Sequence, residues 1–295
     1  ELLTGGHVNE YTNRLGYGHV ASCGCGQCGV FSGHAFQTAL GMTALAATTS
    51  PGVPDKEQEK LIQQGLKLVA MHEVGHTLGL RHNFKGSAVA SLKQINSAKP
   101  RERRSATTSV MDYVPVNIVP KGKFQGPYYP SQLGDYDFWA IEYGYHPLGG
   151  NSPDSEKAAL RKIASRSGDP VLAFATDEDT MPGDPDPLSN RYDLGNDPIA
   201  FAQQRSKVVQ ELIPQLIERF TADDAGYERV RQAFGVLLSA HGQANYFASR
   251  LIGGLYSSRS HREDPHATVP FRVVDAGQQR EALSLLAEQV FSDQS

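Results

Sequence analysis

The stretch that decides the fold of this chain is His72-Glu73-Val74-Gly75-His76-Thr77-Leu78-Gly79-Leu80-Arg81-His82. Because an α-helix makes one turn in about 3.6 residues, His72 and His76 project from the same helix face, one turn apart. Two imidazoles at that spacing suit neighbouring ligands of a tetrahedral zinc ion, which binds histidine nitrogens at about 2.0–2.1 Å. The spacing therefore predicts a helix that carries two metal ligands.

Gly79 and His82 complete the predicted site. A chain that turns back toward the metal needs a residue with positive φ, which glycine adopts at the lowest cost, and His82 can then supply a third nitrogen. Three neutral imidazoles leave zinc dipositive with a fourth position open to an acidified water. Glu73 can take the proton of that water as general base and return it to a leaving amine. The alternative is that His72 and His76 are ordinary helix residues that bind no metal. The presence of Glu73, Gly79 and His82 in the same segment argues against that alternative.

Composition limits the function classes. The chain has 295 residues, of which 39% are hydrophobic and 20% charged, as in a folded protein of one large or two modest domains. The 28 basic residues against 32 acidic ones give a net charge of −4, which argues against a general nucleic-acid binder. Apolar runs stay well short of the roughly 20 residues that cross a bilayer, so we expect no transmembrane segment.

Hydrophobic spacing and the positions of proline and glycine predict mostly helical elements after a mixed beginning. We expect strand and loop over residues 1–32 and a polar loop over 86–108. Asp55 is the predicted N-cap of the helix that carries the histidines. Helices are predicted over residues 33–47, 55–79, 135–143, 154–165, 198–220, 223–250 and 276–292.

The histidine motif resembles that of the metzincin clan of zinc endopeptidases, in which a Met-turn follows the third histidine. The matching segment here is Ser109-Val110-Met111-Asp112-Tyr113. The resemblance implies an α+β fold: a metzincin-like core with a long active-site helix and a Met-turn, then a mainly helical C-terminal subdomain. It also implies that Met111 is the hydrophobic floor beneath the ligands. Tyr113 matches the Met-turn tyrosine of astacin-like and serralysin-like members, whose phenol helps to stabilise the oxyanion; a packing role is the alternative.

Looser likeness extends along the chain to a bacterial group of large secreted zinc-dependent metalloproteases. The similar segments are residues 82–87, 136–145, 192–195, 197–198 and 253–254. This resemblance implies an extracellular or cell-envelope location, either periplasmic or associated with the outer membrane. It also implies a peptide or protein substrate, which would lie extended and antiparallel to an edge strand.

The domain organisation follows from the same comparison. Metzincins build a small sheet and a backing helix before the zinc helix, whereas 71 residues precede His72 here. We therefore expect residues 1–125 to form the zinc-binding catalytic part, without some upstream strands, and residues 1–8 to match the last strand of that sheet. Residues 126–295 are expected to form the mainly helical C-terminal subdomain.

Two further clusters leave alternatives open. The first cluster consists of three cysteines: Cys23, Cys25 and Cys28. They could form a disulfide with one spare thiol, a second metal site with His19 or His34, or a thiolate that covers the zinc. Five carboxylates form an acidic loop, for which we favour a solvated surface over a calcium site: Asp177, Glu178, Asp179, Asp184 and Asp186.

The function that the sequence predicts best is that of a zinc-dependent endopeptidase. Two alternatives remain at this stage. One is a catalytically silent binding module that zinc stabilises, and the other is a zinc amidase acting on a non-peptide substrate.

Overall fold

The computed structural model describes residues 27–48, 56–181, 183–221 and 226–292. The α-helices of these residues are α2 (Gln27–Thr48), α3 (Lys56–Thr77), α4 (Leu92–Ile95), α5 (Asp135–Tyr145), α6 (Pro153–Ala164), α7 (Pro198–Leu212), α8 (Leu216–Phe220), α9 (Glu228–Ser249) and α10 (Ala276–Gln289). Short 3-10 helices are η1 (Gly86–Ala88), η2 (Ser165–Gly168), η3 (Pro170–Leu172), η4 (Asp177–Thr180) and η5 (Ile213–Gln215). Strands β1 (Leu255–Ser257) and β2 (Phe271–Val273) pair antiparallel, with Leu255 opposite Val273. The fold is α+β, as the sequence predicts.

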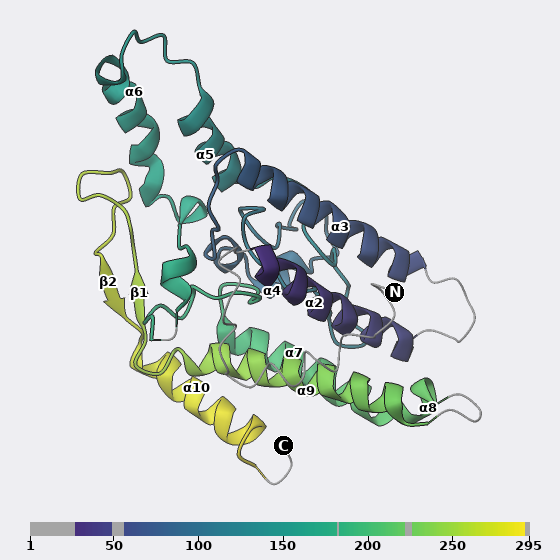
Figure 1. Ribbon diagram of the computed structural model, residues 1–295. Helices are drawn as coiled ribbons and strands as arrows, with labels where there is room; N and C mark the ends of the chain where they lie inside the picture. The colour runs from purple at the N-terminus through teal and green to yellow at the C-terminus, as the bar shows by residue number, and fades with distance from the viewer. Residues whose placement is uncertain (1–26, 49–55, 182, 222–225, 293–295) are drawn as a thin grey trace.

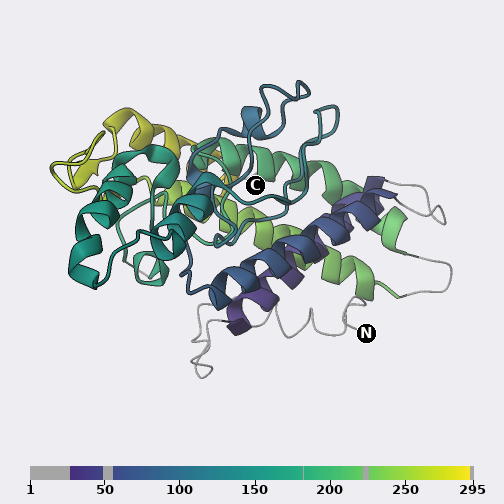
Figure 2. The same cartoon turned by 90° about the horizontal axis from the view of Figure 1, so that it is seen from above.

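The helices form two layers with irregular chain between them (Figure 1). Helices α2 and α3 lie side by side, and α7 packs along α9 below them. Helix α10 lies against α7 and α9, while α5 and α6 extend away from the C-terminal end of α3. The view from above shows α2 and α3 running diagonally across the bundle of α7 and α9 (Figure 2). The long irregular segments after α3 are therefore held between helices.

One hydrophobic core joins the two layers. It includes the fully or nearly fully buried side chains of Leu40 on α2, Leu61 on α3, Leu237 on α9 and Leu285 on α10. Burial of each such side chain contributes roughly 1.5–3 kcal/mol before the entropy of ordering it. Although side chains from both ends of the chain share this core, the boundary near residue 125 stays a prediction. None of the described helices is both long and apolar enough to cross a membrane.

The sequence of α3 favours a helix through the charges of its first turn and the hydrophobic residues of one face. Glu57 and Glu59 lie in its first turn, where the helix dipole favours negative charge. Leu61, Leu68 and His72 are buried on one face, so the hydrophobic stripe leads directly to the first predicted ligand. The predicted N-cap, Asp55, and the predicted strand of residues 1–8 lie outside the described residues.

The remaining elements differ from the predictions in several places. The helix expected over residues 198–220 is divided into α7, η5 and α8, because Pro214 has no N–H for the helical ladder. Helix α2 starts six residues before the predicted 33–47 segment. The predicted loop of residues 86–108 contains η1 and α4. Ser91 and Gln94 form a capping box at the start of α4. The β1–β2 hairpin carries no clear sequence signal.

Candidate metal centre

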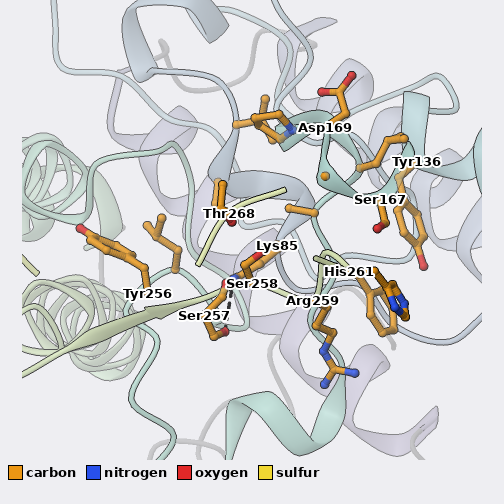
Figure 3. A pocket seen from close by; sticks show the side chains of 18 of the residues that line it. Lys85, Tyr136, Ser167, Asp169, Tyr256, Ser257, Ser258, Arg259, His261 and Thr268 are labelled. Carbon is orange, nitrogen blue, oxygen red and sulfur yellow. Dashed lines mark hydrogen bonds between the residues drawn. The ribbon is translucent and has the colours of Figure 1, made fainter. Parts of the chain in front are cut away.

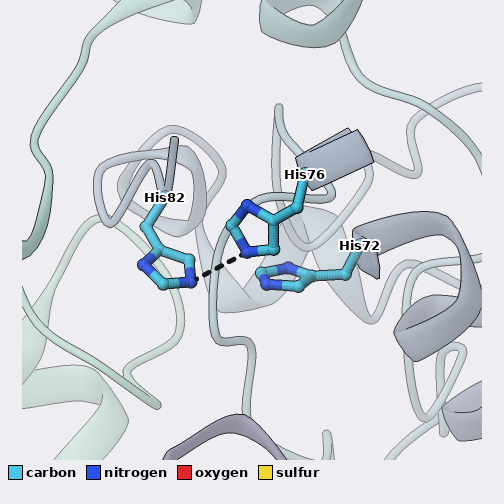
Figure 4. Close-up of side chains that lie close together, drawn as sticks. All are labelled: His72, His76 and His82. Carbon is cyan, nitrogen blue, oxygen red and sulfur yellow. Dashed lines mark hydrogen bonds between the residues drawn. The ribbon is translucent and has the colours of Figure 1, made fainter. Parts of the chain in front are cut away.

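The three predicted ligands converge on one point (Figure 4). One ring nitrogen from each of His72, His76 and His82 lies within 4.8 Å of the other two. Among the described residues this is the only such group of histidine, cysteine or carboxylate side chains. Nε2 of His76 lies 3.2 Å from Nε2 of His82. Two nitrogens bound to tetrahedral zinc at about 2.0–2.1 Å would be about 3.3 Å apart, so the spacing suits zinc.

The end of α3 brings His82 back to the helix. Gly79 has φ +82°, and the N–H of Leu80 donates to the carbonyl of Gly75 at 3.0 Å. The N–H of Gly79 donates to the carbonyl of His76 at 3.0 Å, which completes a Schellman motif. A Cβ on Gly79 would meet no atom within 4 Å, so the backbone conformation alone requires glycine here. The predicted role of Gly79 in ending the helix is confirmed.

Each histidine is oriented by a hydrogen bond from its other nitrogen. The Nδ1 atoms lie against oxygen acceptors as follows: His72 against the carbonyl of Val110 at 2.8 Å, His76 against the carbonyl of Leu80 at 2.9 Å, and His82 against Oδ2 of Asp177 at 2.8 Å. Because a carbonyl or a carboxylate can only accept, the proton belongs on Nδ1 in each ring. All three Nε2 atoms therefore present lone pairs to the shared point.

The donor set fits a metal cation rather than an ordinary hydrogen-bond cluster. Nε2 of His72 is buried and has no hydrogen-bond partner among the described residues. The lone pairs of His76 and His82 face each other, an arrangement that a cation between them would stabilise. Burial lowers the pKa of the His72 imidazole to about 4, and it lowers the pKa of His82 despite the nearby Asp177 carboxylate. Both rings are thus kept neutral, which is the form that binds metals.

Met111 lies beneath the helical histidines. Its side chain is fully buried, and a Cβ added to Gly75 would overlap its Sδ atom. Gly75 stands between the two helical ligands, so the absence of a side chain there lets the sulfur approach the helix. The role of Met111 as the floor of a metal site stays a prediction.

Asp137 fixes the Met-turn from a distant part of the sequence. Its Oδ1 accepts from Oγ of Ser109 at 2.7 Å, and its Oδ2 accepts from the N–H of Val110 at 3.0 Å and of Gly134 at 2.8 Å. The carbonyl of Val110 in turn accepts from His72. Asp137 therefore holds the backbone that orients the first ligand. Sequence reasoning missed this role, although Asp137 lies within a segment that it singled out.

Glu73 and Tyr113 flank the histidines. Oε1 of Glu73 is buried without a hydrogen-bond partner among the described residues, so it is free to accept a proton from a bound molecule. The hydroxyl of Tyr113 lies 3.0 Å from Nε2 of His82, and the phenol is almost fully buried. Burial raises the pKa of Tyr113 above its ordinary value, which keeps the hydroxyl protonated and able to donate.

The acidic loop gives no support to a calcium site. Its carboxylates are each paired with a cationic side chain: Asp177 with Arg191, Glu178 with Arg81, Asp179 with Arg259, Asp184 with Arg250, and Asp186 with Lys85. Calcium requires six to eight oxygen ligands, whereas these oxygens are dispersed among separate ion pairs. Asp177 also accepts from His82, a role that no sequence signal indicated because 95 residues separate the two.

The other predicted cluster falls largely outside the described residues. Cys23 and Cys25 are not described, nor is the side chain of Cys28 at the start of α2. His34 is described, and it is buried against the rings of Tyr129 and Tyr192 at centroid distances of 5.9 and 6.2 Å. Burial lowers its pKa to about 4. The alternatives for the cysteines stay predictions.

A separate cavity of about 810 Å³ lies between the region of α5, η2 and η3 and the β1–β2 hairpin (Figure 3). Its lining includes Tyr136, Trp139, Phe174 and Arg259, and none of the three histidines. The cavity is therefore a different feature from the converging histidines.

The α+β fold, the HExxH helix, the third histidine and the Met-turn define a metzincin-type zinc-binding protein. A family model described as Met-zincin matches residues 54–295, and the chain belongs to this family. No curated protein and no solved structure matches the chain.

Proposed function

We propose that the chain is a zinc-dependent endopeptidase that hydrolyses peptide bonds in a peptide or protein substrate. The observation that carries this proposal is the convergence of three Nε2 lone pairs beside the unpartnered carboxylate oxygen of Glu73. His72, His76 and His82 would hold one zinc ion. When bound, that ion would supply a Lewis acid that polarises a substrate carbonyl and lowers the pKa of a bound water.

Side chains of the protein would then transfer the proton and donate a hydrogen bond during the reaction. Glu73 is the general base, which takes the proton from the attacking water and delivers it to the amine as the peptide bond breaks. The hydroxyl of Tyr113 now donates toward Nε2 of His82, the lone pair that a metal would take. If this lone pair were taken by a metal ion, the Tyr113 hydroxyl would lose its acceptor on His82. The hydroxyl could then donate to the developing oxyanion.

The decisive experiment compares wild type with Glu73→Gln, which removes the base but keeps the size of the side chain. Both proteins should hold about one zinc per chain by elemental analysis, since Glu73 is not a ligand. Cleavage of an unfolded protein substrate should fall by at least about 10²-fold in the variant. Equal rates in the two proteins would contradict the peptidase proposal. Zinc binding without cleavage of any peptide would favour a zinc-stabilised binding module, and cleavage of cell-wall amides alone would favour an amidase.

We also propose an extracellular or cell-envelope location. The support for it is the resemblance of segments such as residues 82–87 and 136–145 to a group of secreted bacterial metalloproteases. Fractionation of cells that produce the protein tests this proposal, and recovery in the cytoplasm alone would contradict it.

A further inference from the structure

Helix η4 carries three carboxylates in succession, and each holds a different arginine. Asp177 pairs with Arg191, Glu178 with Arg81, and Asp179 with Arg259. Among the three, only Asp177 also touches a predicted metal ligand, since its Oδ2 lies 2.8 Å from Nδ1 of His82. Arg259, the partner of Asp179, lines the separate cavity instead (Figure 3).

His82 depends on this contact more than the other two histidines depend on theirs. His72 and His76 are fixed by α3 and donate to backbone carbonyls. His82 lies after the helix has ended, in chain without regular structure, and a side-chain carboxylate accepts its Nδ1 proton. The ring orientation of the third ligand is therefore set by a residue 95 positions away in sequence.

The backbone near Asp177 is attached to the backbone near His82. The N–H of Phe84 donates to the carbonyl of Ala175 at 2.7 Å. The side chain of Asn83 donates from Nδ2 to the carbonyl of Ala173 at 3.0 Å and accepts from the N–H of Ala175 at 3.2 Å. These three hydrogen bonds hold η4 at a fixed distance from the third ligand.

Arg191 fixes the other oxygen of the same carboxylate. One terminal nitrogen of Arg191 donates to Oδ1 of Asp177 at 2.8 Å, and its Nε donates to Oγ1 of Thr180 at 3.2 Å. Its guanidinium lies over the ring of Phe84 at 4.9 Å and near that of Tyr113 at 5.8 Å. Both carboxylate oxygens of Asp177 thus accept a hydrogen bond, one from each side. An asparagine at position 177 would have only one acceptor oxygen. Its NH2 group, which is itself a donor, would then face either His82 or Arg191.

We propose that Asp177, held by Arg191, is the positioning residue that orients His82 and so sets how tightly the protein binds its metal. This inference rests on the proposed function, because it needs the three histidines to bind zinc. It adds a requirement to the histidine motif that only the tertiary structure meets. His82 binds the metal well only when η4 is packed against it, with Asp177 in contact with the ring. A carboxylate behind a ligating imidazole also raises the basicity of the ligand.

The test measures zinc affinity by competition with a chelator of known affinity, which requires no catalysis. Asp177→Asn should weaken zinc binding about 10–100-fold, as removal of a carboxylate behind a ligating histidine does. The matched control is Glu178→Gln, on the same 3-10 helix, whose exposed carboxylate pairs with Arg81 and does not touch a histidine. It should change the affinity by less than about twofold.

A second variant and a spectroscopic measurement separate positioning from a general loss of structure. Arg191→Gln should weaken zinc binding in the same direction, and combining it with Asp177→Asn should add less than the sum of the two effects. In the Co²⁺-substituted protein, the visible absorption bands should shift in Asp177→Asn and stay unchanged in Glu178→Gln, since only the first variant removes a contact to a histidine ring.

The outcomes are distinct. Wild-type affinity in Asp177→Asn, or an equal loss in Glu178→Gln, would overturn this inference while leaving the peptidase proposal intact. A wild-type protein that binds no zinc would overturn both proposals. Weak zinc binding in Asp177→Asn together with normal binding in Glu178→Gln would support the positioning role.

Discussion

Replacing Gly75 by alanine tests whether Met111 fills the space beneath the two helical ligands. Alanine is better than glycine within a helix by about 1 kcal/mol. Against this gain stands the overlap of the new Cβ with Sδ of Met111, a side chain that is fully buried and has little room to move. Overpacking of this kind costs about 1–3 kcal/mol. We therefore expect Gly75→Ala to lower the free energy of unfolding by about 1 kcal/mol, with a range of roughly 0–2.

The sign of the effect should reverse once the sulfur is gone. Met111→Ala alone should cost about 2–5 kcal/mol, because it leaves a cavity in the core. In that background the new methyl group meets no sulfur, so Gly75→Ala should gain about 1 kcal/mol. The coupling between the two substitutions should then equal the overlap, about 1–3 kcal/mol.

Urea unfolding of the four proteins, in the presence of a chelator, measures this cycle without a contribution from metal binding. Gly242→Ala in α9 is the control, since a Cβ there would meet no atom within 4 Å and should gain up to about 1 kcal/mol. A coupling within about 0.5 kcal/mol of zero would refute the reasoning, because Met111 would then not occupy the space under Gly75.

Three further predictions concern the surroundings of the site. Gly79→Ala should cost about 1–2 kcal/mol in urea unfolding and Gly79→Asn less, because the φ of +82° is the only obstacle to a side chain; equal losses would contradict this. Burial lowers the pKa of His34 to about 4 from 6.5, so its contribution to stability is complete above pH 6.5 and is lost as the pH falls toward 4. With a chelator present, His34→Leu should make the free energy of unfolding fall less steeply between pH 6.5 and pH 4. An unchanged slope would contradict this prediction. Asp137→Ala should cost about 1–3 kcal/mol for each buried donor it leaves unpaired and should weaken zinc binding through Val110, whereas exposed Asp154→Ala should cost less than about 1 kcal/mol and leave zinc binding unchanged.

Local features of the site could be predicted from the sequence because they depend on local geometry. The spacing of His72 and His76 fixes their common face through helix geometry alone. Gly79 signals the end of α3 because few other residues adopt positive φ at low cost. The Met-turn is predicted by resemblance, and the structure packs the Met111 side chain against Gly75 of α3.

The contacts that hold the ligands could not be found in the same way. Asp177 belongs to an acidic run that, in sequence, suggests a solvated loop or a calcium site. Asp137 lies in a short helix whose pattern gives no indication that its carboxylate binds the Met-turn. The division of the predicted 198–220 helix at Pro214 was visible in principle, since proline interrupts a helical ladder.

The sequence alone therefore determined that His72, His76 and His82 come together with Glu73 beside them, because spacing along one helix and one turn sets their directions. The tertiary structure decided how those side chains are held: Val110 behind His72, Asp177 behind His82, and Asp137 behind the Met-turn. Each of these contacts joins segments far apart in the chain, so it exists only after the core has formed. Hydrogen bonds of this kind depend on a position in space, which no local pattern of residues encodes.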